Sequence, residues 1–150
     1  MGAYVTSQDV ARSISADMLI HLTVDAVPLP LDAAADGLVI SAVISEAEAL
    51  VDSYLEPAMV LPLTGPALVR ARELALAVAR FKLFSRKNEV SRHEDVRHDF
   101  ERALKELQQI SAKRLPLGDT DAPRVTSARI VKQTAATETY DGRRREAFTS

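Results

Sequence analysis

The stretch PALVRARELALAVARFKLFSR, residues 66–86, has helical periodicity and is apolar on two sides. One stripe of apolar residues is formed by Ala71, Leu74, Val78 and Phe81. Five further apolar residues widen it: Leu68, Ala75, Leu76, Ala79 and Leu83. A helix this broadly apolar packs against several neighbours at once. The stretch therefore predicts the central helix of a bundle. Pro66 suits its first turn, because the N–H that proline lacks would have no partner there.

Two more long helices are expected beside the central one. The first covers about residues 36–55, with Pro57 just beyond its end, and places Glu48 and Asp52 opposite its apolar stripe. The second covers about residues 91–112, where the apolar residues form a single narrow stripe. Both patterns are typical of amphipathic helices with one buried face.

Shorter elements are expected before residue 31. Thr6 is a suitable N-cap with Asp9 in the first turn, and Ser15 is placed to cap a second short helix. Pro28 and Pro30 stand too close together for a helix, so a loop follows. Together these segments predict an all-α fold, a bundle of about four helices over residues 1–118.

The composition agrees with a helical protein and excludes several kinds of site. The 150 residues suffice for one domain, and only 5% are aromatic, with no Trp. The chain has no Cys, which excludes disulfides, thiolate metal sites and cysteine nucleophiles. Without a signal peptide or an apolar run of bilayer length, we expect a soluble intracellular product with no membrane partner.

Residues 119–150 differ from the rest of the chain. They are rich in Thr, Ala, Ser, Arg and Asp, and have few large apolar residues. A weak strand over 125–132 has no sheet to join, so this segment is either disordered or ordered by another chain. We expect the second: an extended C-terminal arm that partner subunits order. Arginine and aromatic side chains are frequent anchors at interfaces. The predicted contact residues of this arm are Arg129, Ile130, Tyr140, Arg143, Arg144, Arg145 and Phe148.

The formal net charge of −2 conceals an uneven distribution. Residues 1–64 hold one basic and nine acidic residues, whereas residues 65–150 hold 18 basic and 12 acidic residues. Two halves of opposite net charge suggest contact with partners or between copies of the chain. An internally neutralised fold, in which the halves pack on each other, explains the same distribution.

No group of residues in the sequence predicts catalysis. His93 and His98 lie near acidic residues, but a spacing of five turns the two rings about 140° apart on a helix, which does not suit a metal. We interpret His21 as a packed or interface residue. Glu48 and Asp52 are one turn apart, with nothing else converging on them. There is no phosphate-binding glycine loop and no nucleophile elbow, so we expect no enzyme, cofactor or metal.

Several landmarks occur in a recognisable order along residues 3–118. They are Ala3-Tyr4, residues 19–23 (LIHLT), 44–55 (ending DSYL), 61–63 (LPL), 66–68, 79–84 (ARFKLF) and 114–118 (RLPLG). In this order they resemble the small head–tail connector (adaptor, or head-completion) proteins of Mu-like tailed phages and prophages.

The resemblance implies a structural protein of the virion neck, assembled in the host cytoplasm. It implies a homo-oligomeric ring of twelve copies below the portal protein, extending the channel for double-stranded DNA and carrying stopper or tail-completion proteins. In such a channel, acids such as Glu48 and Asp52 would repel phosphates and let DNA slide without sequence-specific binding. Two alternatives stay open: a DNA-binding packaging or regulatory protein that uses the basic helix at 65–90, and a tail-side completion protein.

Overall fold

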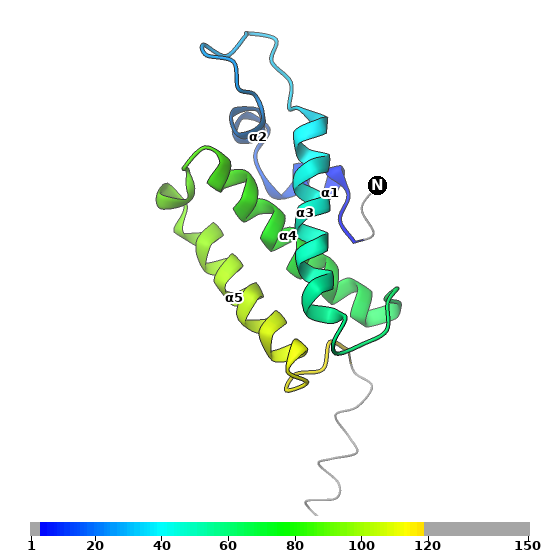
Figure 1. Ribbon diagram of the computed structural model, residues 1–150. Helices are drawn as coiled ribbons and strands as arrows, with labels where there is room; N and C mark the ends of the chain where they lie inside the picture. Colours follow the sequence, from blue (N-terminus) through cyan, green and yellow to red (C-terminus); the bar gives the residue numbers. More distant parts are fainter. Residues whose placement is uncertain (1–3, 119–150) are drawn as a thin grey trace, which may run out of the picture. The chain divides into compact units, whose positions relative to one another are not determined.

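The computed structural model describes residues 4–118, which form five α-helices and one 3-10 turn and contain no strand (Figure 1). The elements are α1 (Ser7–Ser13), α2 (Ala16–Thr23), α3 (Gly37–Leu55), α4 (Gly65–Arg86), the 3-10 turn η1 (Val90–Arg92) and α5 (Glu94–Ser111). The prediction of an all-α bundle is confirmed. The predicted arm at 119–150, with all of its proposed contact residues, lies outside the described residues.

Helix α4 occupies the centre of the bundle, as the periodicity of residues 66–86 predicts. It contacts α1, α2, α3, α5 and η1, and it runs between α3 and α5 in Figure 1. Its buried side chains come from more than one face: Ala71, Leu74, Ala75, Val78, Ala79, Leu83 and Phe84. Phe81 stacks on Phe100 of α5, with the ring centroids 3.9 Å apart. Helix α4 therefore contacts every other described element, while α3 also packs directly on α1 and α5.

Side-chain caps begin two of the helices. Thr6 and Asp9 form a capping box at α1: the Thr6 hydroxyl accepts from the Asp9 amide, and the Asp9 carboxylate accepts from the Thr6 amide. The Asp9 carboxylate accepts from the Thr6 amide and also from the Thr6 hydroxyl, and these two bonds, in that order, lower the pKa of Asp9. Asp36 caps α3 by accepting from the amides of Leu38 and Val39. Ser15 is the N-cap of α2, but its side chain makes no capping bond.

Helices α4 and α5 end in the same backbone motif. Asn88 follows α4 with φ 57°, and the Glu89 amide donates to the Phe84 carbonyl. Lys113 follows α5 with φ 56°, and the Arg114 amide donates to the Gln109 carbonyl. Both are Schellman-type ends, in which a left-handed residue lets the chain turn back and satisfy the last carbonyls. Helix α5 begins at Glu94 rather than at 91, because residues 90–92 form the tighter η1 turn.

Candidate interaction surface

Glu48 is a buried structural residue rather than an exposed acid. Its side chain lies on α3 with the residue only 9% exposed. One carboxylate oxygen, Oε1, accepts from the Tyr4 amide at 2.7 Å and from the Val5 amide at 2.9 Å. The N-terminal segment thus folds back over α3 and covers the carboxylate. The prediction that Glu48 faces solvent, and with it a DNA channel, is wrong.

Asp52 takes part in the same attachment. The Tyr4 hydroxyl donates to Asp52 Oδ1 at 2.5 Å, and Arg72 Nε donates to the Tyr4 carbonyl at 2.9 Å. Burial, then the hydrogen bond to Asp52, raises the pKa of the Tyr4 hydroxyl. One turn of α3 and one arginine of α4 therefore hold the N-terminal segment. The one-turn spacing of Glu48 and Asp52 serves this attachment. Asp52 is only half-buried, so its place in a DNA channel stays a prediction.

The basic residues of 65–90 are bound within the chain. Six side chains carry this charge, and each has an acceptor among the described residues: Arg70 on Glu73 and Glu106, Arg72 on the Tyr4 carbonyl, Arg80 on Asp95 and Asp99, Lys82 on Glu46, and Arg86 and Lys87 on Asp25. Part of the charge asymmetry is thus neutralised internally, because Glu46 and Asp25 belong to the acidic half. Five of the six cations are ion-paired, with Arg86 and Lys87 sharing Asp25, whereas Arg72 binds a neutral carbonyl, so the positive charge that this helix offers to phosphates is reduced.

The three histidines make ordinary contacts. His93 packs edge-on against Phe84, with the ring centroids 4.9 Å apart. His21 lies 3.3 Å from Glu89, and His98 lies 3.9 Å from Glu101. Over residues 4–118, no group of three or more His, Asp or Glu side chains is arranged to hold a metal ion. None of the helices in that part of the chain is long and apolar enough to cross a bilayer.

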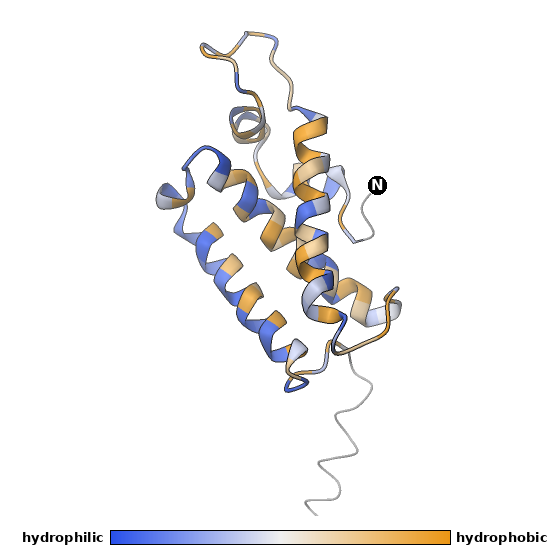
Figure 2. Cartoon of the chain, viewed as in Figure 1, coloured by the Kyte–Doolittle hydropathy of each residue, from blue (hydrophilic) through white to orange (hydrophobic). Residues whose placement is uncertain are grey.

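The apolar loop, residues 24–36 between α2 and α3, is the most exposed hydrophobic element described. Residues 26–31 read AVPLPL and carry no charge. Val27 is 92% exposed and Leu31 is fully exposed, and Leu29 and Leu38 are also open to solvent. In Figures 1 and 2 the loop extends beyond the N-terminal end of α3, away from the other helices, with hydrophobic residues along it. Apolar residues exposed together in this way are typical of interaction sites.

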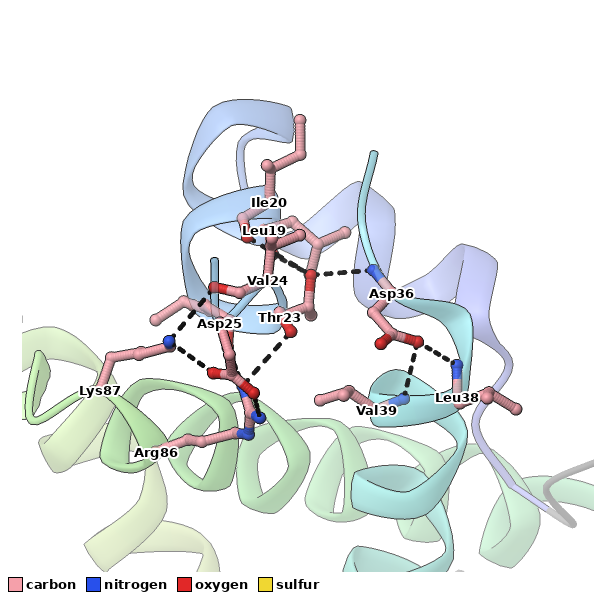
Figure 3. A network of polar contacts seen from close by, with 11 residues as sticks. Leu19, Ile20, Thr23, Val24, Asp25, Asp36, Leu38, Val39, Arg86 and Lys87 are labelled. Atoms are coloured by element: carbon pink, nitrogen blue, oxygen red, sulfur yellow. Dashed lines mark hydrogen bonds and ion pairs between the residues drawn. The ribbon is translucent and has the colours of Figure 1, made fainter. Parts of the chain in front are cut away.

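Polar contacts fasten the base of the apolar loop (Figure 3). The Thr23 hydroxyl donates to the Leu19 carbonyl at 2.8 Å and accepts from the Asp36 amide at 2.9 Å, which ties the two ends of the loop together. Asp25 binds Lys87 Nζ at 2.6 Å and also the Arg86 guanidinium. The hydrogen bonds from Lys87 and Arg86, in that order, lower the pKa of Asp25. The tip of the loop is therefore free while its base is held.

A groove of about 580 Å³ lies between α3 and α4. Its lining combines an apolar floor with a polar rim: Val39, Ala42, Val43 and Phe81, then Glu46, Lys82, Ser85 and Arg86. Lys82 and Glu46 pair with each other across the rim at 3.1 Å. Pro28 and Pro30 predicted the loop, but neither its exposure nor the α3–α4 groove was predicted, because hydropathy alone does not say which apolar residues a fold leaves uncovered.

The comparisons with known proteins give a family. The family model described as bacteriophage Mu, Gp36 matches residues 4–136, nearly the whole chain. The molecule is thus a Mu-like phage protein with a structural or morphogenetic role. It belongs to the bacteriophage Mu, Gp36 family. No curated protein and no solved structure matches the chain significantly.

Proposed function

We propose that this chain is the head–tail connector, or adaptor, of a Mu-like phage. Copies form a ring of twelve below the portal protein in the virion neck. The ring extends the channel for DNA and carries the stopper or tail-completion proteins. Family membership and the order of the sequence landmarks support this function.

The observation that best supports an assembly role is the uncovered apolar loop on a well-packed helical body. Val27 and Leu31 are almost wholly exposed, although buried Leu and Val side chains fill the bundle behind them. Exposing them costs solvation free energy unless a partner covers them. Ring assembly requires heterologous contacts, in which one patch meets a different patch of the next copy.

In this proposal the C-terminal arm, residues 119–150, fastens each copy to a neighbouring subunit or to the portal protein. Tyr140 and Phe148 are its apolar anchors. Its arginines, Arg129 and Arg143–Arg145, form ion pairs with acidic residues of the partner. A chain ending at residue 123 is expected to stay helical by circular dichroism but to be lost from particles. Normal incorporation of that truncated chain would contradict the role of the arm.

The DNA-binding alternative is weaker, because the six cations of residues 65–90 already have partners on this chain. A tail-side completion protein would share the exposed apolar surface, and the phenotype of a deletion separates it from a connector.

Removing the gene from a phage that carries it tests the proposal. For a connector we expect heads that have packaged DNA and complete free tails that do not join, with joining restored when the chain is supplied. Heads that never package DNA would point to a packaging protein instead. Malformed tail ends beside normal heads would point to a tail-side protein, and either result overturns the connector role.

A further inference from the structure

The second half of α5 and the turn after it carry positive charge that the described part of the chain does not neutralise. Arg102, Lys105, Lys113 and Arg114 are all exposed. None of these four side chains has a hydrogen bond or an ion pair with another residue of 4–118. Residues 107–118 also contain no Asp or Glu. The four cations are called here the basic surface of α5.

The acids of α5 that could pair with the first two cations are already bound elsewhere. Glu106 lies one helical turn after Arg102, and Glu101 lies one turn before Lys105. Glu106 instead accepts from Arg70 of α4, with its two carboxylate oxygens 2.6 Å from Nε and 2.5 Å from Nη2. Glu101 pairs with two other side chains of its own helix. The packing of α4 on α5 therefore leaves Arg102 and Lys105 available to a partner.

The composition of the basic surface favours a nucleic acid over a protein as that partner. Between residues 102 and 114, the other exposed residues are Gln108, Gln109 and Ala112. The exposed large hydrophobic residue next to them is Leu115, which is only 38% exposed. Figure 2 shows hydrophilic residues along the side of α5 that faces away from α4. Protein interfaces have an apolar core depleted of Lys, whereas DNA-binding surfaces are polar and strongly positive.

The length of the basic surface suits a chain of phosphates. Arg102, Lys105 and Gln109 recur at helical spacing and share one face of α5. At a rise of 1.5 Å per residue, this face extends roughly 14 Å from Arg102 to the end of the helix, where Lys113 and Arg114 follow. Duplex DNA carries one negative charge per about 1.7 Å of its axis, so several phosphates lie within reach of one copy.

We propose that the basic surface of α5 binds the phosphate backbone of duplex DNA without reading its sequence. The inference rests on the proposed connector, because it states which side of each copy faces the DNA in the channel. Phosphate contacts are independent of sequence and let a protein slide along DNA, as passage through a channel requires. One copy offers few contacts and binds weakly, whereas copies arranged around one duplex bind it together more tightly.

Salt-dependent DNA binding by the full-length chain tests the surface. The wild type and two variants are titrated onto a short fluorescent duplex at several salt concentrations, and the anisotropy is recorded. The test variant removes three cations of the basic surface: Lys105→Gln, Lys113→Gln and Arg114→Gln. The control variant removes three cations that pair with acids of this chain: Lys82→Gln, Arg92→Gln and Arg97→Gln. Both variants change the net charge equally, and both should keep the wild-type circular dichroism because no changed residue is buried.

We expect the wild type to bind two duplexes of unrelated sequence equally. The logarithm of its affinity should fall linearly with the logarithm of the salt concentration, with a slope of about 0.9 for each phosphate contact. The slope of the test variant should therefore be shallower by about 2–3, and its affinity at the lowest salt at least about tenfold lower. The control variant should lose less than about threefold.

Other outcomes overturn the inference in distinguishable ways. A wild-type chain that binds no duplex at the lowest salt lacks such a surface. Equal losses in the test and control variants show that net charge, rather than this surface, governs binding. Stronger binding to poly-glutamate than to a duplex of the same charge shows that the surface serves an acidic protein instead. In each case the connector role stands, because the deletion phenotype tests it separately.

Discussion

The buried Glu48 carboxylate gives the sharpest stability prediction. Its Oε1 atom accepts from two backbone amides, those of Tyr4 at 2.7 Å and Val5 at 2.9 Å, in a residue that is 9% exposed. Glu48→Ala removes the acceptor and leaves two buried N–H groups without it. Glu48→Gln keeps a neutral acceptor oxygen of nearly the same shape. The two variants therefore separate the charge of the carboxylate from its hydrogen-bonding geometry.

The magnitudes follow from these two bonds. A hydrogen bond to a charged group contributes about 1.5–3 kcal/mol, so losing both bonds in Glu48→Ala should cost about 3–6 kcal/mol. Charge-assisted bonds are about twice as strong as neutral ones, so Glu48→Gln should cost about half as much. Glu46→Gln is the matched control, because Glu46 is an exposed acid on the same helix paired with Lys82. Its expected cost is below about 1 kcal/mol.

Urea unfolding followed by circular dichroism measures all three variants, since free energies extrapolate linearly in denaturant. The expected order of stability is wild type and Glu46→Gln highest, then Glu48→Gln, then Glu48→Ala. If Glu48→Ala unfolds within about 0.5 kcal/mol of the wild type, the N-terminal attachment described for Glu48 is wrong.

Further predictions concern the helix ends and the loop base. Gly65→Ala should destabilise by about 1 kcal/mol in the same urea assay, because φ is +61° there, whereas Gly37→Ala, at a site with no close neighbour, should be neutral or stabilising. Lys113→Gly should raise stability by about 1 kcal/mol, because glycine removes the strain of φ 56°; a loss of stability would contradict the motif described for the end of α5. Asp25→Asn should destabilise at neutral pH. Because folding lowers the pKa of Asp25, this difference should be complete above the ordinary value of 3.8 and disappear as the pH falls through the folded-state pKa. A difference that persists in strong acid would show that the ion pairs are not its cause.

Local patterns in the sequence account for most of the fold. The apolar positions of 66–86 predict the central place of α4, because a helix apolar on two sides has to be covered on two sides. Thr6 and Asp36 were expected at helix starts and cap α1 and α3. The predicted start of α5, at residue 91, was too early, because residues 90–92 form the 3-10 turn η1, which winds more tightly than an α-helix.

The site could not be predicted to the same extent, because it depends on contacts between distant residues. Glu48 is polar and faces away from the main apolar stripe, so periodicity indicates solvent, yet Tyr4 and Val5 return from more than 40 residues away to cover it. The DNA-binding alternative treats the cations of 65–90 as available, but Glu46 and Glu106 each lie 36 residues away from the cation that they bind. Two prolines predicted the loop after α2, whereas its exposure follows only from the packing of the bundle.

Electron cryo-microscopy of intact particles, at a resolution that traces helices in the neck, tests the connector role most directly. We predict a closed ring of this chain directly below the portal protein, with the five-helix body of residues 4–118 repeated around the DNA channel. Density for the body at the tail tip, on the capsid shell, or as an isolated copy without neighbours would contradict the account.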